Sequence, residues 1–170
     1  MHRRAVSLLL LIAVAAPGCS RPPSGAPGEA RVERVVDGDT IVVDLAGQEV
    51  TVRLLGIDTP ETHHPDKPIE CHGPEASARL AELLPAGTTV RLARDAELHD
   101  RYGRVLAYAT RAPDGLDVNV TMAAEGHADA LSIAPNTTRA ADISAAVRAA
   151  RDGSLGLWGE CAGPHVPAVP

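Results

Sequence analysis

Three short segments of the chain combine carboxylates with arginines. They are residues 37–40 (Asp-Gly-Asp-Thr), 53–61 (Arg-Leu-Leu-Gly-Ile-Asp-Thr-Pro-Glu) and 100–104 (Asp-Arg-Tyr-Gly-Arg). Carboxylate oxygens bind hard divalent cations such as Ca²⁺, which takes about six to eight oxygen ligands. Guanidinium groups hold phosphate oxygens in a forked geometry and stabilise developing negative charge, and a further carboxylate can deprotonate water. Brought together, the segments contain the groups that metal-assisted phosphoryl transfer requires.

Each segment also has a purely structural interpretation. Asp37-Gly38 is a common hairpin turn, and a lone Arg53 within a strand usually lies on a solvated face. Residues 58–61 are consistent with a simple turn that carries a capping acid, and residues 102–104 with a turn that leads into a strand. The chemical interpretation therefore depends on the three segments meeting in space.

The elements that would position these segments are mostly strands. Runs of β-branched residues separated by turn residues predict strands, and apolar residues at helical spacing predict helices. The predicted strands are residues 32–36, 40–45, 48–57, 88–94 and 105–110. The predicted helices are residues 74–84, 118–125 and 138–151, the last capped by Thr137 or Thr138 and ended by Asp152-Gly153.

The order of these elements selects a fold class. The first three strands have no helical crossovers between them, so a doubly wound parallel sheet is disfavoured. The pattern favours an α+β, mainly β fold, in which a five-stranded oligonucleotide-binding-fold barrel carries about three packed helices.

The first residues have the pattern of an export signal. Arg3 and Arg4 precede an apolar run, residues 5–16, which is too short to span a bilayer comfortably and is followed by small residues and Cys19. Residues 16–20 resemble a bacterial lipobox, in which Cys19 is lipidated; the alternative is simple cleavage and release. The expected organisation is a signal peptide (1–19), a flexible tether (20–30), one domain (31–162) and a tail (163–170).

The charge of the chain limits how it can bind a polyanion. The formal net charge is −6, and loss of the two arginines in the signal makes it more negative still. A protein that binds nucleic acid through a broad basic surface has the opposite charge. The chain also has no Phe and few aromatic residues on which bases could stack. Any phosphate chemistry must therefore rest on a local cluster of cations.

Taken together, the motifs resemble the staphylococcal nuclease family. The similarity covers residues 31–158 and is concentrated in residues 36–40, 53–62, 73–78, 100–108 and 155–158. It implies an exported monomer that cleaves DNA and RNA with calcium at the 5′ P–O bond and leaves 3′-phosphate ends. The implied location is extracellular or on the cell surface, with contact to the membrane only through an N-terminal lipid.

The resemblance also assigns roles to individual residues. Asp39 and Asp58 match the calcium-binding carboxylates, and Thr59 matches the residue whose backbone carbonyl completes the protein ligands. Arg53 and Arg104 match the phosphate-binding arginines, and Glu61 matches the general base toward water. Tyr102 matches a tyrosine that contacts the terminal phosphate of a bound nucleotide, and Lys67 falls in the loop beside the site.

The chain departs from the family where bases are bound. Leu131 and Ile133 stand where the type member has tyrosines that stack on the base. We expect weaker stacking, by about 1–3 kcal/mol for each lost ring. Nucleotide affinity should fall and base preference should change, with the chemical step retained.

Other metal sites fit the sequence less well. An EF-hand that begins at Asp37 fails because Ile41, Val42 and Gln48 stand where that loop needs an oxygen ligand, a Gly and a Glu. The possible zinc ligands fit no strong spacing template; they are His63, His64, Cys71 and His72. Export favours instead a disulfide between Cys71 and Cys161, which with a lipidated Cys19 accounts for all three cysteines.

Two other function classes remain as alternatives. One is a catalytically weak nucleic-acid-binding module, because some domains of this family have lost the active site and serve as binding platforms. The other is a calcium-stabilised surface lipoprotein, in which paired arginines would have no purpose. Both alternatives predict that the protein does not cleave nucleic acid.

Overall fold

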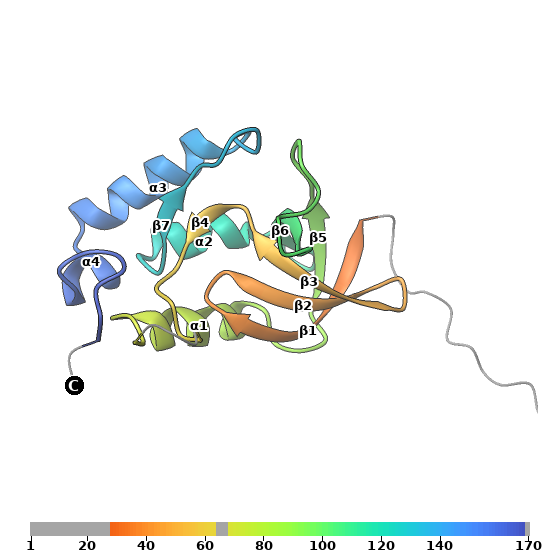
Figure 1. The fold of residues 1–170 in the computed structure, drawn as a ribbon, viewed down its shortest axis with the longest axis horizontal. Helices are drawn as coiled ribbons and strands as arrows, with labels where there is room; N and C mark the ends of the chain where they lie inside the picture. The colour runs from red at the N-terminus through yellow and green to blue at the C-terminus, as the bar shows by residue number, and fades with distance from the viewer. Residues whose placement is uncertain (1–27, 64–67, 169–170) are drawn as a thin grey trace, which may run out of the picture.

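Five strands form a closed barrel at the centre of the protein (Figure 1). The computed structural model describes residues 28–63 and 68–168. The barrel strands are β1 (Glu29–Asp37), β2 (Thr40–Leu45), β3 (Gln48–Leu54), β5 (Thr89–Ala93) and β6 (Val105–Arg111), in the order β1-β2-β3-β6-β5. Neighbouring strands are antiparallel except β3 and β6, which are parallel, and β1 pairs with β5 to close the barrel.

Alternating apolar residues explain why these strands close around a core. Val52 and Leu54 on β3 are fully buried, as are Ile41 and Val43 on β2. Because side chains alternate between the two faces of a strand, residues two apart share the inward face. The intervening Arg53 is therefore left at the strand surface, where it is available to a site.

The described residues form four helices, one more than the sequence predicts. They are α1 (Gly73–Leu83), α2 (Val118–Ala124), α3 (Ala140–Asp152) and α4 (Leu157–Glu160). Leu80, Met122 and Ile143, from the first three, join the same buried cluster as the strands. Figure 1 shows α1 against one end of the barrel and α3 on the other side, beyond β4 and β7. The mainly β barrel with packed helices is therefore confirmed.

The strand predicted at residues 48–57 is wrong as a single element. β3 ends at Leu54, and a separate strand β4 (Gly56–Asp58) pairs with the unpredicted β7 (Asp129–Leu131). Gly56 has a φ of +81°, a conformation that side chains other than glycine rarely adopt. A Cβ on Gly56 would also lie 2.3 Å from the Cδ1 atom of Ile143. The break turns the chain out of the barrel just before Asp58.

The predicted cap of the last helix is also wrong. The N-cap of α3 is Arg139, with no side-chain cap. Thr138 is used elsewhere, because its hydroxyl and its backbone N–H both donate to the carboxylate of Asp95, at 2.8 and 2.9 Å. A long-range partner has replaced the local cap.

Both ends of the described chain belong to the packed structure. β1 begins at Glu29, inside the segment expected as a tether, and Ala30 is buried. Val166 lies in the segment expected as a tail, yet its carbonyl accepts a hydrogen bond from the N–H of Cys71. The predicted signal peptide and Cys19 lie outside the described residues. Within residues 28–63 and 68–168, no helix has the length and apolar character needed to cross a membrane.

A disulfide joins Cys71 to Cys161, which are 90 positions apart in sequence and have their Cα atoms 6.1 Å apart. We expect the double substitution Cys71→Ser and Cys161→Ser to lower the free energy of unfolding by about 2–5 kcal/mol, because it frees a long loop in the unfolded chain. Urea unfolding without reductant measures this. Reductant should bring the unaltered protein to the same stability, and equal stability of both proteins without reductant would contradict the prediction.

Candidate active site

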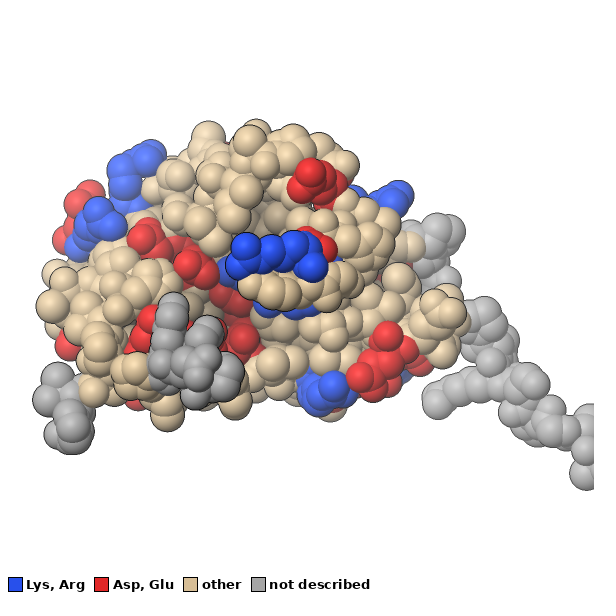
Figure 2. All heavy atoms as spheres, in the orientation of Figure 1, with Lys and Arg blue, Asp and Glu red and all other residues tan. Residues whose placement is uncertain are grey.

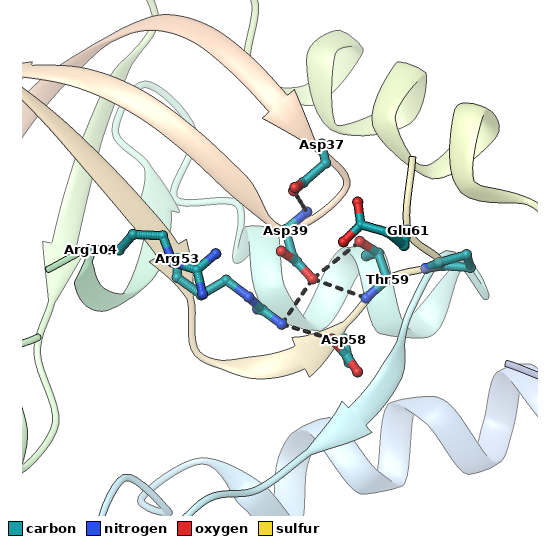
Figure 3. A pocket seen from close by; sticks show the side chains of 8 residues that line it. Asp37, Asp39, Arg53, Asp58, Thr59, Glu61 and Arg104 are labelled. Atoms are coloured by element: carbon teal, nitrogen blue, oxygen red, sulfur yellow. Dashed lines mark hydrogen bonds and ion pairs between the residues drawn. The ribbon is translucent and has the colours of Figure 1, made fainter. Parts of the chain in front are cut away.

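The three polar segments meet in one pocket of about 190 Å³. Its lining residues are Asp37, Asp39, Arg53, Asp58, Thr59, Pro60, Glu61 and Arg104. Figure 3 shows Arg53 and Arg104 on one side of the pocket, Glu61 on the opposite side, and Asp39 between them. Six predicted site residues from three separate segments are thereby brought within one small space.

The position of β3 between β2 and β6 explains this convergence. Arg53 pairs with Thr40 on β2, directly after Asp39, and with Leu106 on β6, two residues after Arg104. The turn between β1 and β2 and the start of β6 therefore lie on either side of Arg53. β4 follows β3 closely and delivers Asp58 to the same edge of the barrel.

Asp39 is fixed by the loop that follows β4. Its Oδ2 atom accepts hydrogen bonds from the N–H and the hydroxyl of Thr59, at 3.0 and 3.2 Å, and Oδ1 accepts from the hydroxyl of Thr40 at 3.0 Å. A Cβ on Gly38 would lie 2.7 Å from the Oγ1 atom of Thr59. Glycine at that position therefore permits the close approach that buries the carboxylate.

The guanidinium of Arg53 bridges two carboxylates. Its Nη2 atom lies 2.9 Å from the Oδ2 atom of Asp39 and 2.9 Å from the Oδ1 atom of Asp58. Its Nη1 atom donates to the backbone carbonyls of Leu54 and Ile57, at 2.7 and 2.8 Å. The side chain is 13% exposed. It is thus a nearly buried counter-ion, held by its own strand and facing the pocket.

Negative charge nevertheless exceeds positive charge in the pocket. Burial, followed by the neighbouring Asp39, raises the pKa of Asp37 to about 6. Burial also raises the pKa of Asp58, despite the opposing effect of Arg53. Figure 2 shows acidic side chains gathered in a groove on the viewed face, with basic side chains on its rim. A cation in this pocket would relieve the cost of keeping these carboxylates charged.

The donor chemistry fits a hard divalent cation, since the pocket offers several carboxylate oxygens. In residues 28–63 and 68–168, however, no three His, Cys, Asp or Glu side chains already form a metal-binding group. Arg53 lies between Asp39 and Asp58, so these two carboxylates contact a guanidinium in place of a metal ion.

Arg104 is held in place by Asp100. The Nε atom of Arg104 lies 2.6 Å from the Oδ2 atom of Asp100, whose Oδ1 atom accepts from the backbone N–H groups of Tyr102 and Arg104, each at 2.9 Å. Burial alone would raise the pKa of Asp100, but these hydrogen bonds lower it. The turn at residues 100–104 therefore fixes the second guanidinium at the pocket.

Glu61 faces the arginines from the far side. Its Oε1 atom accepts hydrogen bonds from the backbone N–H groups of Thr62 and His63, at 2.9 and 2.8 Å. Its own N–H donates to the Oε2 atom of Glu70 at 2.9 Å, and Glu70 is buried. The carboxylate is therefore anchored through one oxygen.

Comparison with known proteins agrees with this geometry. Residues 51–160 match the family model described as "Staphylococcal nuclease homologue". The chain is 41% identical over 127 residues to the thermonuclease of Staphylococcus intermedius, and 38% identical over 128 residues to that of Staphylococcus hyicus. Each match covers 75% of this chain and 74% of the relative. The chain belongs to the staphylococcal nuclease family.

A third relative extends the comparison beyond staphylococci. It is the endonuclease YncB of Bacillus subtilis, 35% identical over 128 residues, which are 75% of this chain and 60% of that protein. The family resemblance expected from the sequence is confirmed. The protein is a staphylococcal-nuclease-type hydrolase.

One residue of the predicted site, Tyr102, is not among the residues that line the nuclease pocket. Tyr102 is 69% exposed and stands at the rim, with the guanidinium of Arg101 4.7 Å and that of Arg104 5.6 Å from its ring centroid. Lys67 lies outside the described residues, as does His64. Tyr102 therefore lies beside the arginines and outside the group of residues that surrounds the carboxylates.

A second cavity of about 500 Å³ adjoins the nuclease pocket and shares its arginines. Leu131 and Ile133 line it together with Tyr102, Arg53 and Arg104. The two residues expected to stand in place of tyrosines thus border the space next to the two arginines that the sequence predicts to bind phosphate. Their apolar side chains offer contact area and no ring on which a base could stack.

Cys71 and His72, two of the residues considered for zinc, have other partners. The sulfur of Cys71 is in the disulfide. His72 is buried, and its ring nitrogens lie 2.9 Å from Glu160 Oε2 and 2.9 Å from His127 Nδ1. These contacts connect the start of α1 to α4 and to the residues after α2, and they account for His72 structurally.

Sequence reasoning missed three residues that contact the site. Asp37 lines the pocket, although it was interpreted as a turn residue. Glu70 accepts the hydrogen bond from the N–H of Glu61, and His165 lies 3.2 Å from Asp58. The Asp-Gly-Asp motif could have revealed Asp37, but nothing local marks Glu70 or His165, which reach the site only through tertiary contacts.

Proposed function

We propose that this nuclease hydrolyses phosphodiester bonds of DNA and RNA with calcium, cleaving the 5′ P–O bond and leaving 3′-phosphate ends. The main support is the structure of the pocket, which brings together two aspartate carboxylates, two guanidinium groups and a glutamate. Relatives named thermonuclease and endonuclease support it.

The carboxylates of Asp39 and Asp58 and the backbone carbonyl of Thr59 would hold the calcium ion. When bound, the ion would draw electron density from a phosphoryl oxygen and offset the charge that develops there. The excess of carboxylates over cations among the pocket residues supports this assignment, because a divalent ion would balance it. It would also let an acidic protein accept a polyanion.

The protein's own side chains would perform the rest of the chemistry. The carboxylate of Glu61 takes a proton from water as the water oxygen forms a bond to phosphorus. The guanidinium groups of Arg53 and Arg104 bind the equatorial oxygens as their negative charge grows. The bond from phosphorus to the 5′ oxygen breaks, and that oxygen leaves with its electron pair and is then protonated.

We also propose that the protein is exported and acts outside the cell or on its surface. The N-terminal signal pattern supports this, and so does the disulfide between Cys71 and Cys161, because disulfides persist in oxidising compartments. Lipidation at Cys19 and release after cleavage are the two outcomes. Mass spectrometry of the mature N-terminus separates them.

Cleavage assays with purified residues 20–170 test the proposed activity. Single-stranded DNA and RNA are incubated with calcium and then with an excess of chelator, and the ends are analysed. We expect cleavage of both only with calcium, with 3′-phosphate ends. Asp39→Asn should lose most activity at limiting calcium, whereas the exposed Glu49→Gln should match the unaltered protein. Activity that persists in chelator would refute the role of the metal.

A further inference from the structure

The C-terminal strap, residues 161–168, runs back to the active site after the last helix. The disulfide fixes its first residue, Cys161, to Cys71. The N–H of Cys71 donates to the carbonyl of Val166 at 2.7 Å, and the N–H of Ala168 donates to the carbonyl of Ile69 at 2.9 Å. The strap is therefore held along residues 69–71, directly after the loop that carries Glu61.

His165 extends from this strap toward the pocket. Its Nε2 atom lies 3.2 Å from the Oδ2 atom of Asp58, and its Nδ1 atom lies 2.9 Å from the Oε2 atom of Glu70. Its backbone has a φ of +58°, in the left-handed region that is uncommon for residues other than glycine. The strap thus holds an unusual backbone conformation at the residue whose ring reaches Asp58.

The contact from His165 complements the one from Arg53. Arg53 meets the Oδ1 atom of Asp58, and His165 meets the Oδ2 atom. With a side chain on each oxygen, rotation of the carboxylate about its Cβ–Cγ bond is restricted. Asp39 is restrained differently, because the backbone N–H of Thr59 reaches its carboxylate. Asp58 depends on side chains for its orientation.

We infer that His165 is a positioning residue of the active site, which orients the carboxylate of Asp58 toward the calcium ion. This inference rests on the proposed function for the identity of the ion. Carboxylates that bind metals are themselves commonly held by hydrogen bonds, and loss of such a partner typically lowers metal affinity or activity about 10–100-fold. The sequence interpretation placed His165 in a tail outside the domain.

Two amide substitutions separate the contacts of the two ring nitrogens. The amide nitrogen of glutamine reaches about as far as Nε2, so His165→Gln preserves a donor toward Asp58. The amide nitrogen of asparagine corresponds to Nδ1, so His165→Asn preserves only the donor toward Glu70, and asparagine tolerates the left-handed conformation. A role in positioning Asp58 predicts that glutamine substitutes for histidine and that asparagine does not.

The test measures calcium affinity by titration calorimetry without substrate, and kcat and KM on single-stranded DNA across calcium concentrations. We expect His165→Ala and His165→Asn to raise the calcium Kd about 10–100-fold and to recover most of kcat at saturating calcium. His165→Gln should stay close to the unaltered protein, as should Val166→Ala, a control in the same strap.

The outcomes distinguish this inference from the proposed function. Unchanged calcium affinity in His165→Ala, in a protein whose parent binds calcium and cleaves DNA, would overturn the inference alone. Rescue by asparagine and not by glutamine would also overturn it, because that would assign His165 to fastening the strap at Glu70. An unaltered protein that neither binds calcium nor cleaves would overturn the proposed function and the inference with it.

Discussion

Glutamine in place of Glu61 should lower the turnover number of this nuclease by about 10²–10⁴-fold, the usual contribution of a general base. The carboxylate faces the two arginines across the pocket (Figure 3), so it lies opposite the groups proposed to bind the phosphate. Glutamine has nearly the same shape but a negligible affinity for protons. Steady-state cleavage of single-stranded DNA at saturating calcium measures the effect.

The geometry of Glu61 makes glutamine a fair substitute in every other respect. The amide oxygen can still accept from the N–H groups of Thr62 and His63, and the backbone bond to Glu70 is unaffected. We therefore expect calcium affinity and the free energy of unfolding to change little. A turnover number equal to that of the unaltered protein would remove Glu61 from the chemical step, and Glu49→Gln controls for loss of one negative charge.

The barrel could be predicted because its signals are local. Apolar residues alternate along β3 and form a short continuous run in β2, and the Asp-Gly turn separates the end of β1 from the start of β2. Strand pairing then follows from short connections. Part of the candidate site is predictable for the same reason. Thr40 on β2 pairs with Arg53 on β3, and this register places Asp39 beside Arg53.

The remaining features depend on contacts between distant parts of the chain. Gly56 breaks the third strand because Ile143, from α3, fills the space beside it. Thr138 does not cap the N-terminus of α3, because it donates to Asp95 in the loop after β5. His165 contacts Asp58 because the disulfide and the hydrogen bonds to residues 69–71 hold the strap beside the site. A sequence read in short windows contains none of these relations.

Removal of the Arg53 side chain should affect both activity and stability. Arg53→Ala removes one of the two guanidinium groups available to a phosphate, and loss of one such group typically lowers kcat about 10²–10³-fold. It also leaves Asp39, whose side chain is 8% exposed, without its ionic partner. Breaking a buried pair from one side costs about 3–5 kcal/mol, because the remaining charge is uncompensated. Urea unfolding in the presence of a chelator measures that loss.

Arg53→Lys separates charge from geometry in the same experiment. A lysine keeps a cation near the aspartates but has a single nitrogen, which cannot serve Asp39 and Asp58 while also donating to the carbonyls of Leu54 and Ile57. It should recover part of the stability and little of the activity. Full activity in Arg53→Lys would show that only the charge at this position matters.

Calcium provides the decisive comparison, because in the proposed site it and Arg53 neutralise the same carboxylates. Calcium should raise the free energy of unfolding of Arg53→Ala more than that of the unaltered protein. In the variant, the ion relieves the repulsion between Asp39 and Asp58 that Arg53 no longer relieves. Activity should not return with stability, because the ion cannot replace the forked contact to phosphate. An equal gain from calcium in both proteins would mean that the ion binds away from Asp39 and Asp58, and the assignment of these two carboxylates would then be wrong.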